Sequence, residues 1–328
     1  VYRIKLFTRS LPKNLFFQFI KYIEYCFRVA LYAKNNKINI VTIHHLPLLP
    51  LGVLLKCILR GKLVYDAHEL ETETYGRNGV RQLLARFVES VFIRYPDLVM
   101  VVSGGIYESY RKRYGLENII TVKNCPDLLE PLGGDRLHRD LGLPPDKKII
   151  IYQGGLIRGR GIEKLLSALS GISDSRYVGV FMGYGELESM IQKYASSNDN
   201  IFLKEAVSHS EVHEYTSSAF VGISYIDNPS LNDYYCLPNK FFEYIMAGLP
   251  VIVNDAPEMK KIVIDYKIGI VLDDLTCETL TNSLLKIEAM DSFELKMNLN
   301  RASKDNCWSK QACAMLDGYG KHVVGVDS

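Results

Sequence analysis

LPNKFFEYIMAGLP, residues 237–250, is the most informative stretch of the chain. Pro238 opens a predicted helix, Gly248 ends it, and an apolar strand over Val251–Val253 follows at once. Proline at the start of a short helix and glycine just after its end are the usual boundaries. The N-terminus of such a helix suits a phosphate or a polar sugar, because it presents unpaired N–H groups. About one turn further on, the Glu243 carboxylate can accept hydrogen bonds from the paired hydroxyls of a ribose. An ordinary amphipathic helix of an α/β domain is the alternative.

Length and composition bound the class of protein. The 328 residues correspond to about two domains, and a hydrophobic content of 48% is enough for two cores. The net charge of +2 gives no bulk attraction to nucleic acid, so no nucleic-acid partner is expected. The seven cysteines form no CxxC pair, which fits the reduced thiols of a cytoplasmic protein. The sequence contains no apolar run of about 18 residues, so we expect no membrane-spanning helix.

Apolar strand-like runs alternate with helical patterns along the chain, which predicts βαβ units and parallel sheets. Proline, glycine and charge interrupt this pattern over residues 124–147, as in an interdomain linker with a short helix. We therefore expect an N-terminal Rossmann-like domain over 1–126, a linker over 127–147 and a nucleotide-sugar-binding domain over 148–308. A C-terminal helix over 309–328 can cross back to the first domain. The predicted strands are Arg3–Phe7, Ile40–Ile43, Lys62–Tyr65, Leu98–Val102, Ile119–Val122, Lys148–Tyr152, Tyr177–Met182, Ile201–Leu203, Val221–Ser224, Val251–Val253 and Gly269–Leu272.

A glycine-rich turn follows the first strand of the second domain. It contains Gly154, Gly155, Arg158 and Arg160, and a helical pattern comes directly after it. Glycines let a backbone approach a pyrophosphate closely, and arginines add charge-assisted hydrogen bonds to it. The turn therefore predicts a phosphate site, with sheet packing as the alternative.

Two further turns also follow strands. Gly183 and Gly185 form a Gly-x-Gly turn that either a ligand or tight packing explains. In the first domain, His68 lies just past a strand and can hydrogen-bond a phosphate or a sugar hydroxyl. Asp66 and Glu69 beside it can orient the ring or raise its pKa. A structural histidine that caps the turn is the alternative.

Other features of the first domain allow more than one interpretation. His44 and His45 are adjacent at the end of a strand and so point to opposite faces, which prevents them from serving one metal together. One of them can face an acceptor. Ser103 suits a helix cap.

Residues Leu15–Ala33 combine aromatic and aliphatic side chains with basic ones, as does a helix that lies on an anionic membrane. A helix packed between the sheet and a neighbour is the other explanation.

In their order along the chain, these motifs resemble those of the family-4 glycosyltransferases, which have the GT-B fold. Glu243 matches the second glutamate of the family signature, and Met246, Ala247 and Gly248 match the helix end that follows it. Tyr235 stands in place of the first glutamate. The resemblance implies an α/β architecture of two doubly wound Rossmann-like domains that face each other across a cleft.

By this resemblance the chain is expected to move a sugar, with retention, from a nucleotide-diphosphate sugar to a glycan or lipid-linked acceptor in surface polysaccharide synthesis. It implies catalytic roles for His68, Arg160 and Glu243, with no metal and no other cofactor. It also implies a cytoplasmic location, at the inner face of the membrane if Leu15–Ala33 makes contact there. The implied donor-binding residues are Gly154, Gly155, Arg158, Gly183, Gly185, Tyr235, Leu237, Pro238, Asn239 and Lys240.

Two other functions remain open at this point. One is a nucleotide-sugar-binding or partner subunit without turnover. The other is a GT-B epimerase of the nucleotide sugar, in which Asp66 or Glu69 would abstract the proton. Arg3–Phe7 resembles the third strand of the family pattern, so we expect the start of the N-terminal domain, with its acceptor-side glycine loop, to lie outside this chain.

Overall fold

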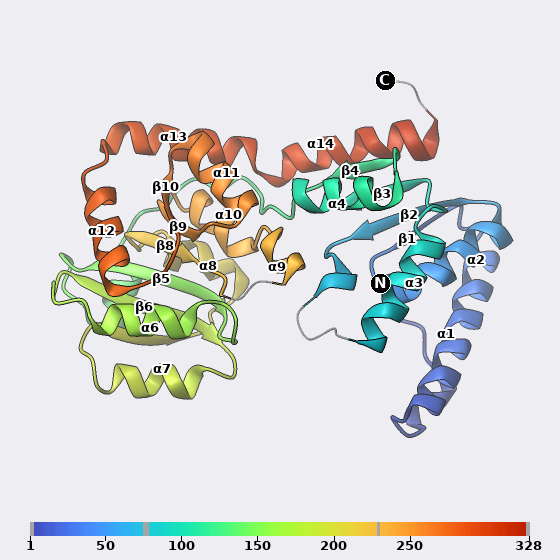
Figure 1. Cartoon of the computed structure of the whole chain (residues 1–328), viewed down its shortest axis with the longest axis horizontal. Coiled ribbons are helices and arrows are strands. Elements are labelled where there is room, and N and C mark those ends of the chain that lie inside the picture. Colours follow the sequence, from blue (N-terminus) through green and yellow to red (C-terminus); the bar gives the residue numbers. More distant parts are fainter. Residues whose placement is uncertain (1–2, 75–78, 228–229, 326–328) are drawn as a thin grey trace. The chain divides into compact units, whose positions relative to one another are not determined.

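The computed structural model of the chain describes residues 3–74, 79–227 and 230–325 (Figure 1). It divides into two compact units. The first comprises Val1–Val101, Tyr107–Ile120 and Leu316–Ser328, and the second comprises Val102–Ile106 and Thr121–Met315.

The first unit is built on a four-stranded sheet in the order β1-β2-β3-β4. β1 pairs with β2, and β2 with β3, in parallel. β3 is buried along its whole length, because its run of apolar side chains is covered on both faces. The strands are β1 (Ile40–Ile43), β2 (Lys62–Ala67), β3 (Leu98–Val101) and β4 (Ile119–Thr121), and the helices are α1 (Leu15–Asn35), α2 (Leu49–Leu59), α3 (Val80–Phe92) and α4 (Gly104–Tyr114), with short turns η1 (Phe7–Ser10), η2 (Leu46–Leu48) and η3 (Glu71–Glu73).

The prediction of a strand over Arg3–Phe7 is wrong. Residues 3–6 form no regular element, and a 3-10 turn, η1, follows them. The Glu24 carboxylate on α1 accepts the N–H groups of Phe7 and Thr8 at 2.8 and 2.9 Å. These are donors that a strand would offer to a neighbouring strand, so the segment is fixed to the helix instead.

Helix α1 packs through one face against α2, where Tyr25, Cys26, Val29 and Ala30 meet buried Leu51 and Leu55. The expected second neighbour is not seen among the described residues, since the opposite face of α1 exposes Phe16, Phe19, Ile23, Phe27 and Leu31. This exposed apolar stripe is the surface that the membrane interpretation requires. Contact with a membrane stays a prediction.

The second unit has a six-stranded parallel sheet in the order β10-β9-β8-β5-β6-β7. The ten strands of the two sheets match the other ten predicted strands, with differences at their ends. In this sheet they are β5 (Lys148–Gly155), β6 (Tyr177–Tyr184), β7 (Ile201–Glu205), β8 (Val221–Ser224), β9 (Val251–Asn254) and β10 (Gly269–Leu272).

Helices cover both faces of this second sheet (Figure 1). One core packs under α5 (Arg136–Leu141), α8 (His209–Thr216), α10 (Asn239–Met246), α11 (Pro257–Tyr266) and α13 (Ser292–Asp305), and the other under α6 (Ile162–Ser170), α7 (Glu188–Ala195) and α12 (Cys277–Glu288). The short α9 (Leu231–Tyr234) precedes α10. The last helices are α14 (Trp308–Tyr319) and the π-helical η4 (Gly320–Val324). The Tyr319 hydroxyl lies 3.2 Å from that of Thr42, within the first unit.

Candidate functional site

The strand order of the second sheet reverses between β5 and β8. In open α/β sheets, ligands bind beyond the carboxyl ends of the strands at such a reversal. The Tyr244 hydroxyl occupies this position, where it accepts the Gln153 N–H at 3.1 Å and donates to the Ile223 carbonyl at 3.3 Å. Gly222 provides the space, since a Cβ there would lie 2.3 Å from the Tyr244 ring. Helix α10 is therefore anchored at the carboxyl ends of β5 and β8.

Glu243, the next residue of α10 toward its N-terminus, has a fixed orientation. Its Oε2 accepts a hydrogen bond from Gln153 Nε2 at 2.6 Å. The Gln153 Oε1 in turn accepts from the Thr216 hydroxyl at 2.6 Å, and Gln153 is 3% exposed. A buried chain of side chains thus holds a partly exposed carboxylate in the position predicted for a ribose contact.

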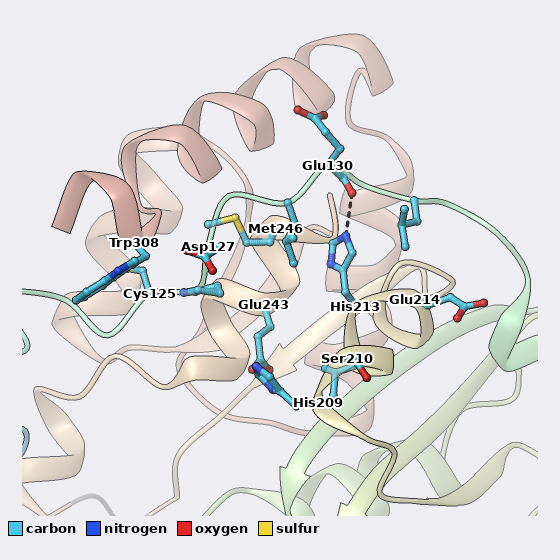
Figure 2. Close-up of a pocket in the computed structure, with 14 residues that line it drawn as sticks. Cys125, Asp127, Glu130, His209, Ser210, His213, Glu214, Glu243, Met246 and Trp308 are labelled. Carbon is cyan, nitrogen blue, oxygen red and sulfur yellow. Dashed lines mark hydrogen bonds between the residues drawn. The ribbon is translucent and has the colours of Figure 1, made fainter. Parts of the chain in front are cut away.

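Glu243 lines a cavity of about 730 Å³ within the second unit (Figure 2). The segment before α5 forms one wall, and α8 forms another, with His209 and His213 among its residues. The His213 Nε2 lies 2.8 Å from the Glu130 carbonyl oxygen, which ties the two walls together. The cavity is large enough for part of a nucleotide.

Two basic side chains, those of Lys240 and Arg160, lie near the end of β5. The Lys240 amine sits 3.5 Å from the centre of the Tyr152 ring, and a Cβ on Gly154 would be 3.8 Å from it. Gly154 has φ +110°, a backbone conformation that residues other than glycine rarely adopt. Burial, together with the charge of Arg160, holds the pKa of Lys240 well below its usual range. A bound anion would relieve this, because it would stabilise the charged amine.

The two arginines of the glycine-rich turn have different surroundings. Arg160 Nη1 lies 3.5 Å from Asp233 Oδ1, and its side chain is 35% exposed. The Arg158 side chain is 70% exposed and lies 3.9 Å from Glu163 Oε1. The charge of Arg160 acts on Lys240. A diphosphate contact by either arginine stays a prediction.

Packing accounts for the glycines of the Gly-x-Gly turn. A Cβ at Gly183 would lie 1.9 Å from the Gly154 carbonyl oxygen, and one at Gly185 would lie 2.4 Å from that of Leu156. By contrast, a Cβ added at Gly155 would lie 3.9 Å from its nearest neighbour, an atom of the Ile157 side chain. Gly183 and Gly185 therefore let the ends of β5 and β6 approach each other. Their contact with a donor stays a prediction.

The residues before and within the first turn of α10 differ in what they offer. Leu237 is buried in the core, so it can present only its backbone to a ligand. Pro238 is the N-cap, and Asn239 accepts a hydrogen bond from the Asn124 side chain at 3.0 Å. The Tyr235 ring packs edge-on against Tyr234. The predicted helix and its end at Gly248 are confirmed, since α10 spans Asn239–Met246.

His68 belongs to the first unit, where it lies beside Asp66 and His44. His45 points elsewhere, with its Nδ1 3.5 Å from Glu71 Oε1. The prediction that the adjacent histidines diverge is therefore confirmed. The Ser103 hydroxyl accepts the Ile106 N–H at 3.4 Å, which confirms the predicted cap.

Sequence reasoning missed several of these features. The i, i+4 spacing of His209 and His213 predicts one helical face, and Ser208 forms a capping box with Glu211, so the α8 wall could have been recognised. No local sequence pattern predicts the hydrogen bond between Gln153 and Glu243, because the two residues are far apart in the chain. Across the described ranges, no helix combines the length and the apolar character needed to cross a membrane.

Comparisons with known proteins identify the family. Residues 134–306 match the family described as glycosyl transferases group 1, and residues 4–128 match glycosyltransferase family 4. A candidate colanic acid biosynthesis glycosyl transferase of Escherichia coli, WcaI, is 26% identical over 137 residues, which are 39% of this chain and 34% of WcaI. A candidate teichuronic acid biosynthesis glycosyltransferase of Bacillus subtilis, TuaC, is 28% identical over 123 residues, which are 37% of this chain and 28% of TuaC. The chain thus spans about a third of the length of these curated relatives.

Solved structures show the same fold. Sucrose-phosphate synthase from Thermosynechococcus elongatus superposes with a TM-score of 0.75 at 19% identity, covering 97% of this chain and 82% of that one. Anabaena HepE in complex with UDP gives a TM-score of 0.69 at 15% identity, covering 89% and 81%. The predicted GT-B class, with two Rossmann-like domains, is confirmed. The match to the family described as glycosyl transferases group 1 covers residues 134–306, more than half of the chain. The chain therefore belongs to that family.

Proposed function

We propose that this protein transfers a sugar, with retention and without a metal ion, from a nucleotide-diphosphate sugar to a glycan or lipid-linked acceptor of a surface polysaccharide. The observation that carries the proposal is the arrangement at the switch point of the second sheet. There the Lys240 amine lies over Tyr152 in β5, the charge of Arg160 acts on that amine, and Gln153 holds the Glu243 carboxylate on α10. The relatives named for colanic and teichuronic acid biosynthesis support the acceptor class.

The chemistry follows from the charges. When the bond from the anomeric carbon to the diphosphate oxygen breaks, negative charge develops on the leaving group. Arg160 and Lys240 are placed to stabilise that charge, which is the main electrostatic demand of the reaction. Backbone N–H groups at the start of α10 bind the sugar or a phosphate. For His68 we keep the donor contact that the family resemblance implies.

Replacing Glu243 tests the donor site. Glu243→Gln is expected to weaken nucleotide binding by about 1–3 kcal/mol, the size of a lost hydrogen bond to a charged group. Glu214→Gln is the matched control, because Glu214 also lines the cavity but pairs with Arg136 at 3.4 Å. Calorimetric titration with UDP and with GDP measures both variants. An unchanged affinity in Glu243→Gln would remove this residue from the site.

The proposed neutralisation of the diphosphate by side chains has a second consequence. Transfer is expected to continue in excess EDTA, since Arg160 and Lys240 replace a divalent ion. A radiolabelled donor with and without acceptor provides the measurement. Loss of transfer that manganese or magnesium restores would contradict the mechanism. Nucleotide binding without any product would favour a partner subunit, and an epimerised donor would favour the epimerase.

A further inference from the structure

Three side chains that can bind a metal meet at the carboxyl ends of two neighbouring strands of the first unit. β1 and β2 are parallel with Ile43 opposite Tyr65, so His44 follows in register with Asp66. His68 lies at the bend that follows β2, two residues beyond Asp66. Strand register therefore brings His44 beside Asp66, and the bend after β2 adds His68 to them.

The three potential ligand atoms form a nearly equilateral triangle. His44 Nδ1 lies 3.1 Å from Asp66 Oδ2, His68 Nε2 lies 3.2 Å from the same oxygen, and the two nitrogens are 3.1 Å apart. Tetrahedral zinc with nitrogen and oxygen ligands at about 2.0–2.2 Å has ligand-to-ligand edges of about 3.3–3.6 Å. The triangle is thus slightly smaller than one face of such a site, and an ion would move the ligands apart by about a few tenths of an ångström.

The chemistry of the ligands selects the class of ion. Two imidazoles and one carboxylate suit a transition-metal dication, whereas magnesium and calcium prefer sites made of oxygen atoms. The side chains of His44 and His68 are 52% and 48% exposed, and that of Asp66 is 16% exposed. An ion can therefore enter from solvent, and a fourth position remains for water.

We propose that His44, Asp66 and His68 form a binding site for one transition-metal dication of the zinc class. All three ligands belong to the first unit, whereas Arg160 and Lys240 belong to the second. His68 is also the residue for which a donor contact is proposed above, so a bound ion would take the imidazole nitrogen that this contact needs. In excess EDTA the cluster holds no ion and His68 is free for the donor contact, so transfer without metal remains compatible with zinc binding at this cluster. In the absence of an ion, the same three groups form a hydrogen-bonded cluster.

Titration of the full reduced chain with cobalt, followed by visible absorption, tests the proposal. Nitrogen and oxygen ligands give tetrahedral d–d bands without the near-ultraviolet charge-transfer band of a thiolate. This distinction is needed because the described chain contains exposed Cys57 and Cys313. We expect one equivalent to bind with the nitrogen and oxygen spectrum, and zinc to displace it.

His44→Ala and His68→Ala are each expected to weaken cobalt and zinc binding by roughly tenfold or more, since even changes behind the ligands commonly cost that much. His45→Ala is the matched control, because it removes an exposed imidazole one residue away that faces Glu71. Circular dichroism melts check that each variant folds. Equal affinity in all three variants, a thiolate band as the sole signal, or no saturable binding by the native chain would overturn the site.

Discussion

Arg160→Ala is expected to lower the rate of sugar transfer by about 100- to 1,000-fold. This is the usual cost of removing one group that stabilises charge in a transition state. The Lys240 amine lies over Tyr152 in β5, and the charge of Arg160 acts on it, so both groups are expected to stabilise the same leaving group. The ion pair of Arg160 with Asp233, at 3.5 Å, is partly exposed and contributes little to stability. The melting temperature should therefore change little while the rate falls, as single-turnover assays would show.

Combining this change with Lys240→Ala tests whether the two cations act together. If both stabilise one diphosphate, the double variant should lose less than the sum of the single losses, since coupled residues are not additive. Arg158→Ala provides the comparison and should cause a smaller loss, because its side chain is mostly exposed and lies beside Glu163. Strict additivity of Arg160→Ala and Lys240→Ala would contradict a shared phosphate contact.

Local sequence patterns predicted the sheets well, because buried parallel strands need uninterrupted apolar runs such as Leu98–Val101. The same rule failed at Arg3–Phe7, where a carboxylate about twenty residues later takes the backbone donors. No local pattern reports such a partner. The helix α10 was predictable for the opposite reason, since Pro238 and Gly248 define its ends by their own backbone preferences.

The candidate site was less accessible, because its groups meet through tertiary structure. Lys240 was expected among the donor-binding residues, but no local pattern predicts that its amine lies over Tyr152, almost ninety residues earlier in the chain. Gln153 reaches Glu243 across a similar separation. The grouping of His44 with His68 is intermediate, since it follows from strand register once the ends of β1 and β2 are known.

Gly183→Ala is expected to affect the fold and the site together. Gly183 pairs with Gly154 across β5 and β6, and the added Cβ would lie 1.9 Å from the Gly154 carbonyl oxygen. Backbone atoms must move to relieve this contact, so the free energy of unfolding should fall by about 1–3 kcal/mol. Gly155→Ala is the control for stability and should stay within about 0.5 kcal/mol, because its Cβ would have no neighbour closer than 3.9 Å.

The nucleotide affinity of the Gly183→Ala variant separates the two explanations of the Gly-x-Gly turn. Displacement of Gly154 would also move the backbone beside the Lys240 amine, so UDP or GDP should bind roughly tenfold more weakly, equivalent to about 1.4 kcal/mol. Denaturant unfolding and calorimetric titration, performed where circular dichroism shows the variant folded, give both quantities. Lower stability with unchanged affinity would mean that the turn serves packing alone and that the phosphates bind without the end of β5. A fall in both stability and nucleotide affinity would show that nucleotide binding depends on the close approach of β5 and β6, because the added methyl group acts on the backbone where these two strands meet.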